Sequence, residues 1–334
     1  MAKNKKKETN NNRRNNRKKI LLFIIMLLLM AVFGTVTYAW FSSNMKLNID
    51  TMDININTMS GIQVSANGIN WSNTITKDDL INAIKTYPNA TNQLPETLAG
   101  CSTDGSVDGR TLNMYYGDTR LHGDEGYFLT ATKQTEINCV GDEECRGKHY
   151  IAFDIFVLLN ENVNLVVTGE SFVNNKSDSV EGGENSARIA FLNLGTTTET
   201  TNGIRAQSLA NASNSVIWEP NYDTHTEFGV ENAQNIYGIT TTQTGGQRLP
   251  YKGINSEITG KGVQISATDS SPYFTAVNPQ IYTPKGFNTD QDLMPLTRGI
   301  TKMRIYFWLE GQDVDLENKV SGGKLEFKLE LAIK

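Results

Sequence analysis

KMRIYFWLEG, residues 302–311, and KLEFKLELAIK, residues 324–334, are the stretches that decide the fold. In both, Met, Ile, Phe or Leu occupies every second position, which is the period of a β-strand that buries one face. The Ser321-Gly322-Gly323 sequence between them is typical of a turn. The pattern predicts an antiparallel pair of strands with one wet face and one face packed on a second layer.

A further strand is predicted at residues 150–159, YIAFDIFVLL, where both faces are apolar, as in a strand buried between layers. Elsewhere Thr, Asn, Ser and Gly are abundant, which favours strands and loops. Thr76 and Asp79 match a capping box and predict a short helix over 77–85. We expect a mainly β fold: an antiparallel, jelly-roll-like β-sandwich with loop-rich insertions at 86–148 and 195–290.

Residues 20–41, ILLFIIMLLLMAVFGTVTYAWF, contain no charged residue. As a helix, this segment is long enough to cross the hydrocarbon core of a bilayer. The basic residues of 1–19 predict a disordered cytoplasmic tail, and their charge places the body, 42–334, outside the cytoplasm.

Two interpretations of this hydrophobic segment remain open. Thr37 and Ala39 supply the small residues that precede a signal-peptide cleavage site, which predicts a cut by signal peptidase between Ala39 and Trp40. In the other interpretation the helix stays in the membrane as a signal anchor, and Trp40 belongs to an aromatic belt at the outer interface. The body is extracellular or cell-surface in both cases.

The sequence GTVTYAWFSSN, residues 34–44, is similar to the start of the TasA/camelysin group of exported proteins in Gram-positive bacteria. The run IYFWLEGQDVDLEN, residues 305–318, resembles a recurrent ending of exported proteins from the same bacteria. The first resemblance implies a secreted β-sandwich that builds surface fibres or matrix, with a leader cut by a dedicated signal peptidase.

The charge distribution excludes one class of partner. The formal net charge is −5, and nine Lys and Arg residues precede residue 20, so the body is considerably more acidic than the whole chain. Nucleic acids and anionic membrane surfaces bind positive patches. We therefore expect no nucleic-acid partner.

The three cysteines of the chain are Cys101, Cys139 and Cys145. In an exported protein, Cys139 and Cys145 can close a small disulfide loop across GDEE; free thiols are the alternative. Cys101 is left over in either case. No Cys-x-x-Cys pair is present, so zinc and redox sites are not supported.

Asp154 interrupts the apolar run 150–159. A buried carboxylate needs a partner, and we nominate Arg188, in the strand-like run SARIAF, for a structural ion pair. A catalytic or metal-binding role for Asp154 is the alternative.

Four carboxylates cluster near the C-terminus, in LEGQDVDLEN, and closely spaced carboxylates of this kind can bind calcium. They are Glu310, Asp313, Asp315 and Glu317. The EF-hand pattern is not met, so a solvated hairpin loop is the competing interpretation. No other cofactor is expected.

Aromatic residues in strand-like or loop contexts suggest a surface on which sugar rings stack; packing in the core is the competing interpretation. They are Trp71, Trp218, Tyr222 and Trp308.

The sequence contains no recognised catalytic motif, and His122, His149 and His225 lack the spacing of metal ligands. We therefore expect a non-enzymatic exported structural protein of the cell surface or biofilm matrix. It would self-associate by donating the strand at 44–56 to a neighbour. The alternatives are a membrane-anchored adhesin or carbohydrate-binding module, and a secreted hydrolase.

Overall fold

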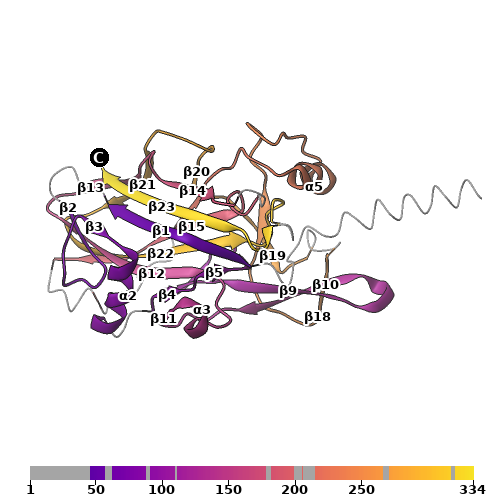
Figure 1. Cartoon of the computed structure of the whole chain (residues 1–334), viewed down its shortest axis with the longest axis horizontal. Coiled ribbons are helices and arrows are strands. Elements are labelled where there is room, and N and C mark those ends of the chain that lie inside the picture. Colours follow the sequence, from indigo (N-terminus) through magenta and orange to yellow (C-terminus); the bar gives the residue numbers. More distant parts are fainter. Residues whose placement is uncertain are drawn as a thin grey trace, which may run out of the picture. The chain divides into compact units, whose positions relative to one another are not determined.

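The computed structural model describes residues 46–56, 62–87, 91–109, 111–177, 182–198, 205, 215–265, 271–316 and 320–334. All of them belong to one compact unit. This unit is built mainly of β-strands, as the alternating sequence patterns predicted (Figure 1).

Two large sheets contain most of the described strands. The smaller sheet has seven described strands in the order β21-β13-β23-β1-β3, with β14 also paired to β23 and β5 to β1. Its strands are β1 (Leu47–Ile56), β3 (Thr74–Ile75), β5 (Thr97–Leu98), β13 (Val163–Val167), β14 (Phe172–Asn175), β21 (Gln291–Leu296) and β23 (Lys324–Ile333).

The larger sheet has twelve described strands and follows the path β11-β4-β12-β22-β6-β9-β10-β18, with β2, β15, β16 and β20 paired beside it. Its strands are β2 (Ile62–Ser65), β4 (Gln93–Leu94), β6 (Gly100–Ser102), β9 (Tyr115–Leu121), β10 (Tyr127–Lys133), β11 (Cys139–Val140), β12 (Ile151–Leu159), β15 (Ala187–Thr197), β16 (Ser215–Glu219), β18 (Ile258–Gln264), β20 (Ile281–Tyr282) and β22 (Gly299–Glu310).

The remaining described elements are small. Two two-stranded sheets pair β7 (Val107–Asp108) with β8 (Thr111–Leu112) and β17 (Tyr251–Ile254) with β19 (Phe274–Val277). The helices are α2 (Lys77–Thr86), η1 (Gly123–Glu125), α3 (Gly141–Glu144) and α5 (Glu227–Tyr237). Helix α2 confirms the predicted capping box, because the Thr76 side chain accepts a hydrogen bond from the Asp79 amide and the Asp79 side chain accepts one from Thr76.

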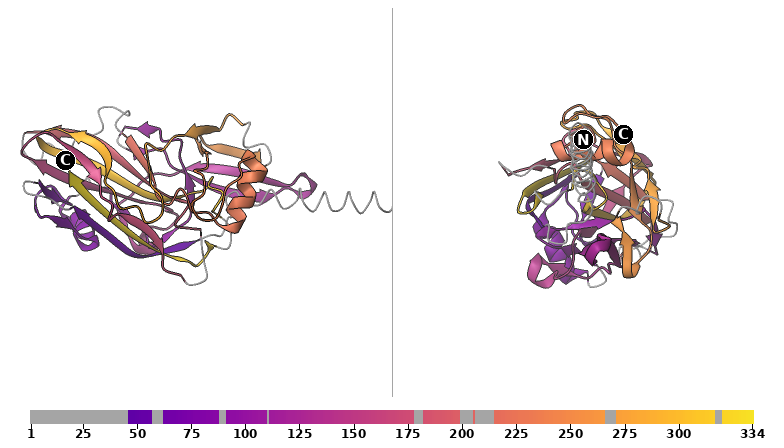
Figure 2. Two further views of the ribbon diagram at one scale, coloured as in Figure 1. Left: turned by 90° about the horizontal axis from the view of Figure 1, so that it is seen from above. Right: turned by 90° about the vertical axis from the view of Figure 1, so that its right-hand side faces the viewer.

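The expectation of a purely antiparallel architecture is wrong, because both large sheets are mixed. The most extensive parallel pair joins β1 to β23, from Asn48 opposite Lys324 to Ile56 opposite Leu331. These strands lie side by side, in indigo and yellow, in Figure 1 and in the left view of Figure 2. Parallel neighbours need a long connection, and here almost the whole described chain lies between them.

The two stretches that decide the fold form β22 and β23, but the prediction that they pair with each other is wrong. They belong to different sheets and face each other across a shared core. The rings of Phe307 and Phe327 stack at 4.7 Å between their centroids. Leu325, Leu329 and Leu331 of β23 are fully buried in the same core, as the alternation predicted.

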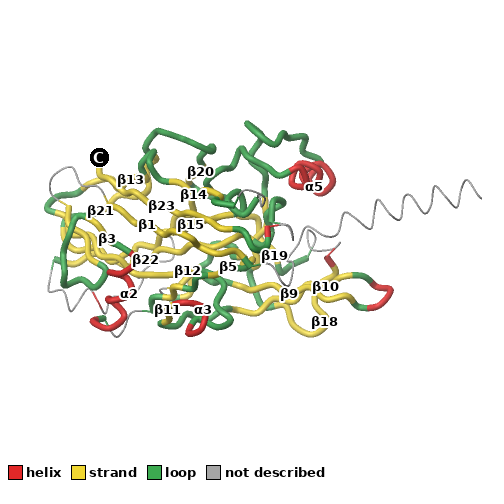
Figure 3. Tube along the Cα trace, in the orientation of Figure 1, coloured by secondary structure: helices red, strands yellow, loops and turns green. Residues whose placement is uncertain are grey.

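The expected wet face of β22 is also absent. Arg304, Tyr306, Trp308 and Glu310 are at most 1% exposed. The two segments expected to be loop-rich insertions contain short strands and turns (Figure 3). Their side chains pack on this face in a second apolar cluster. The β22 strand is therefore buried on both faces.

Candidate functional site

A row of polar side chains runs along the covered face of β22, because alternate residues of a strand point to the same side. The row consists of Lys302, Arg304, Tyr306, Trp308 and Glu310, and all five are buried. Buried charges are costly unless they are paired and hydrogen-bonded. The partners of this row therefore decide what the site can do.

Arg304 lies at the centre of the row and binds two carboxylates. Its guanidinium donates to Asp154 Oδ1 at 2.8 Å and to Glu136 Oε2 at 2.5 Å. Tyr306 donates its hydroxyl proton to the other oxygen of Glu136, at 2.5 Å. Lys302 Nζ lies 3.4 Å from Asp154 Oδ2. Burial disfavours ionisation of Asp154, but Arg304 and Lys302 together outweigh it and lower the pKa of this carboxyl group.

The nominated ion pair between Asp154 and Arg188 does not form. Arg188 instead donates to Glu219 Oε1 at 2.8 Å and to Asp313 Oδ2 at 2.6 Å. The strand register explains the error. Asp154 of β12 lies opposite Arg304 of β22, whereas Arg188 of β15 lies opposite Trp308 of β22. The two charges are thus held apart along the same strand.

Arg188, Glu219 and Asp313 form a second buried charge cluster, the Arg188 cluster, and Glu219 connects it to the surrounding loops. Its other carboxylate oxygen accepts a hydrogen bond from Arg248 Nε at 2.7 Å. The carboxylates of Glu219 and Asp313 favour the charged form of Arg188, so its pKa is raised despite complete burial. The Arg188 cluster therefore joins β15, β16 and the segment that follows β22 by charge-assisted hydrogen bonds.

His225 and Asp315 form a third buried pair beside this cluster. His225 Nδ1 lies 2.9 Å from Asp315 Oδ2, and Nε2 lies 2.9 Å from the carbonyl oxygen of Gln247. Both ring nitrogens face acceptors, so the doubly protonated imidazolium satisfies both contacts. Asp315 also accepts from the backbone amide of Thr226, the N-cap residue of α5. The pair thus attaches the start of α5 to the segment after β22.

The pKa of His225 gives a pH-dependent prediction. Burial lowers this pKa, but the hydrogen bond and charge of Asp315 outweigh burial and raise it above 6.5. The stabilisation is therefore fully present below pH 6.5 and is lost as the pH rises through the folded-state pKa. After correction for the base-catalysed rise of intrinsic exchange with pH, we expect the protection factors of the α5 amides to fall over that interval in the wild type, and His225→Gln to remove this fall.

His149 provides the matched control for that measurement. Its ring stacks on Tyr116 at 4.0 Å, and burial lowers its pKa to about 4. It is therefore neutral throughout the relevant range, and His149→Gln should leave the pH dependence of exchange in α5 unchanged. An identical pH profile in wild type and His225→Gln would show that the imidazolium does not hold α5.

The cavity between these groups is small. It is lined by Asn185, Glu219, Tyr222, His225 and Asp313, among others, and has a volume of about 10 Å³. That is room for a single water molecule. Asn185 Oδ1 is buried and has no hydrogen-bond partner among the described residues, so a water bound there would satisfy it.

The acidic residues expected to bind calcium have different partners. Glu310 accepts hydrogen bonds from the Trp308 indole and the Gln312 amide, both at 3.1 Å. Asp313 binds Arg188 and Asp315 binds His225, while Glu317 lies outside the described residues. Within the described ranges, no three His, Cys, Asp or Glu side chains are grouped to hold a metal ion.

The aromatic residues expected to stack on sugars do not form one surface. Trp218 and Trp308 are fully buried, so their assignment to a binding surface is wrong. Trp71 is partly exposed and packs against the cluster of Tyr87 and Phe156. Tyr222 lies elsewhere, with its ring edge-on to Tyr282 at 5.4 Å.

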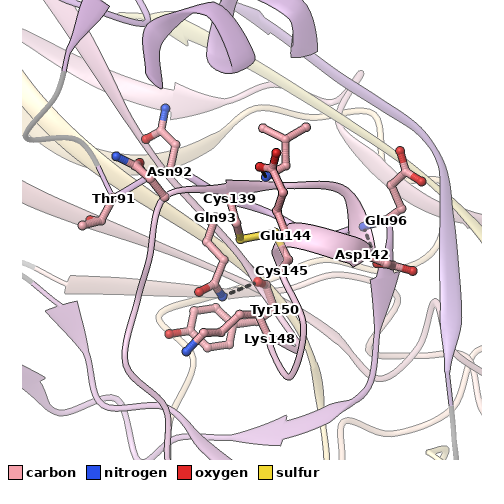
Figure 4. Close-up of a disulfide and its surroundings, with 12 residues drawn as sticks. Thr91, Asn92, Gln93, Glu96, Cys139, Asp142, Glu144, Cys145, Lys148 and Tyr150 are labelled. Carbon is pink, nitrogen blue, oxygen red and sulfur yellow. Dashed lines mark hydrogen bonds between the residues drawn. A yellow bond between two sulfur atoms is a disulfide. The ribbon is translucent and has the colours of Figure 1, made fainter. Parts of the chain in front are cut away.

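Cys139 and Cys145 form the disulfide that the sequence suggested (Figure 4). Cys101 is a buried free thiol. The disulfide encloses α3, whose Asp142 carboxylate accepts from the backbone amides of Glu96 at 3.0 Å and Thr97 at 2.9 Å. The loop therefore holds the segment around β5 against the larger sheet.

The leader lies outside the described residues, so the tail 1–19, the helix 20–41 and the cleavage site at Ala39 and Trp40 remain predictions. Among the residues that are described, no helix is long and apolar enough to cross a bilayer.

Several residues of the site escaped sequence reasoning, among them Glu136, Glu219, His225, Lys302 and Arg304. The alternation of charged and apolar residues in β22 is the same whether the polar face meets water or a covering segment. The one usable signal that this face is covered was its unusual row of Lys, Arg, Tyr and Trp, because such long amphipathic side chains also line buried polar interfaces.

Comparison with protein-family models, curated protein sequences and solved structures found no significant match. Each carboxylate of the site is bound by a cation or by backbone amides, and His225 has an acceptor at each ring nitrogen. Such a site is suited to holding the covering segments on the larger sheet.

Proposed function

We propose that this protein is a non-enzymatic, exported structural protein of the cell surface or extracellular matrix, and that it assembles by exchanging its first strand, β1. The observation that carries the proposal is the position of β1. It pairs with β23 along nearly its whole length, and the two strands come from opposite ends of the described chain.

The pairing of β1 on its other side is short. There, ladder pairing with β5 covers Leu47 and Asn48, and ladder pairing with β3 covers Ile54 and Asn55. A β1 strand from a neighbouring chain can take the same register along β23 without altering any other connection of the fold. Exchange of an identical element in this way is a low-cost route to assembly.

The proposal extends to the architecture and the compartment. The two packed sheets would form a β-sandwich of jelly-roll type. The segment at 20–41 would export the body, either as a cleaved signal peptide or as a membrane anchor. The disulfide between Cys139 and Cys145 supports export, because structural disulfides persist in oxidising environments.

A cysteine pair tests the exchange. Asn48 and Lys324 are register partners, and both are exposed. In Asn48→Cys/Lys324→Cys, an isolated monomer should form an intramolecular disulfide, whereas assembled protein should form a ladder of covalent multimers on a non-reducing gel. Oxidation before assembly should block fibre growth, and reduction should restore it.

The single variants Asn48→Cys and Lys324→Cys are the controls, since neither can form the 48–324 bond. Wild-type protein treated with the same reductant controls for loss of the natural disulfide. If the double variant forms only intramolecular bonds in assembled material, assembly does not use strand exchange.

A further inference from the structure

A second cavity, of about 160 Å³, lies on the outer side of the smaller sheet. Its lining includes Phe172 and Asn174 of β14, Asn221 and Phe287. We propose that it binds a single neutral sugar ring. This inference is independent of strand exchange, which concerns β1.

The floor of the cavity is set by the alternation along β14. Val173 is fully buried in the core between the sheets. Phe172 and Asn174 therefore point to the opposite side, and both remain partly exposed. An aromatic ring and an amide are thus placed next to each other on a rigid strand.

A tight turn supplies the second aromatic wall. The Phe287 amide donates to the Pro284 carbonyl oxygen at 3.2 Å, and Gly286 has φ of 71°, a conformation that glycine adopts readily. The Phe287 ring meets Trp218 edge-on, with 6.0 Å between centroids. Trp218 was expected to contact a sugar itself, but it instead supports Phe287 from behind.

Asn221 forms the third wall and has the only positive φ of a non-glycine residue in the described chain, 56°. Its amide nitrogen donates to the carbonyl oxygens of Val173 at 2.8 Å and Glu184 at 3.1 Å. These two bonds hold the turn that carries Asn221 against β14. Backbone strain of this kind concentrates at functional sites.

The chemistry of the lining favours a polyol ring without charge. Two aromatic rings can cover the C–H faces of a sugar. The amide of Asn174 can bind hydroxyl groups, and the amide oxygen of Asn221 can accept from one, since its nitrogen already donates to Val173 and Glu184. The cations described near the cavity are already paired: Lys328 Nζ lies 3.5 Å from Glu170 and 3.3 Å from Glu330, and Lys285 Nζ lies 3.8 Å from Glu184. These cations are therefore not available to an anionic ligand, and the cavity is large enough for one pyranose.

Saturation-transfer NMR and calorimetry on the full-length protein test the proposal, with a panel of neutral hexoses and N-acetylhexosamines and with glucuronate as the charged comparison. We expect saturable binding of at least one neutral sugar and weaker binding of glucuronate. Asn174→Ala and Phe172→Ala should each weaken binding by about ten-fold or more, which is about 1.4 kcal/mol.

Tyr282→Ala is the control, since this ring is 50% exposed and is not part of the lining. It should leave sugar affinity unchanged. If Phe172→Ala lowers thermal stability, the result for Asn174→Ala is decisive, because the Asn174 side chain forms no hydrogen bond with the described residues. Absence of saturable binding across the panel, or binding that Asn174→Ala leaves unchanged, would overturn the proposal. Neither result would bear on the cysteine cross-linking test of strand exchange.

Discussion

Replacing Arg304 with Met is expected to lower the free energy of unfolding by about 3 to 5 kcal/mol. The variant would leave the carboxylates of Asp154 and Glu136 buried, the second without its cationic partner. Such uncompensated charge is among the most destabilising changes in a folded protein. Chemical denaturation of the full-length protein at neutral pH measures the loss.

Arg120 provides a matched control for the Arg304 variant. It pairs with Asp118 at 2.8 Å, but its side chain is 73% exposed. Exposed pairs contribute little, so Arg120→Met should change stability by less than about 1 kcal/mol.

A double variant tests the electrostatic explanation directly. Arg304→Met combined with Glu136→Gln removes the one orphaned charge, leaves Asp154 paired with Lys302, and should recover part of the loss. A cost for Arg304→Met as small as that of the Arg120 control would mean that water reaches the two carboxylates.

The second large effect is expected from Glu310. Burial raises the pKa of this carboxyl group to about 7, from 4.5, although the Trp308 indole and the Gln312 amide donate hydrogen bonds to it. Between pH 4.5 and pH 7, the Glu310 carboxyl group is ionised in the unfolded chain but keeps its proton in the folded chain. The contribution of Glu310 to stability should therefore fall by about 3 kcal/mol as the pH rises from 4.5 to 7.

Glu310→Gln isolates this contribution. A glutamine has one acceptor oxygen where the carboxylate has two. At least one of the three donors, the Ser102 hydroxyl, the Trp308 indole and the Gln312 amide, therefore loses its partner, and a pH-independent loss of about 1 to 3 kcal/mol is expected. The pH-dependent decline attributable to Glu310 should disappear, so the variant's disadvantage shrinks as the pH rises. Denaturation midpoints of both proteins across this range measure the difference. Parallel profiles would show that Glu310 ionises without cost in the folded protein.

Local sequence patterns correctly predicted the parts of the fold that depend on a few neighbouring residues. The alternation in 324–334 predicted the buried face of β23, because that face meets a single apolar layer. Thr76 and Asp79 predicted the start of α2, since a capping box is closed within one turn. The spacing of Cys139 and Cys145 suggested their disulfide for a similar reason.

The candidate site depends on contacts between distant segments. The sequence indicated that Asp154 needs a cationic partner, but two arginines were candidates: Arg188 on β15 and Arg304 on β22. The partner was decided by the β12–β22 register, which places Arg304 directly opposite Asp154. A register is set by packing and turn geometry over long stretches, so a pattern within one strand does not contain it.

By itself, the sequence determined which residues form the main strands, that the fold is mainly β and that the body is acidic, because alternation and composition act locally. Only the tertiary structure decided that β22 and β23 belong to opposite sheets and that the polar face of β22 is covered. The physical reason is that a row of Lys, Arg, Tyr and Glu can be satisfied equally by water or by partner side chains. Which of these it meets depends on where segments from elsewhere in the chain are folded.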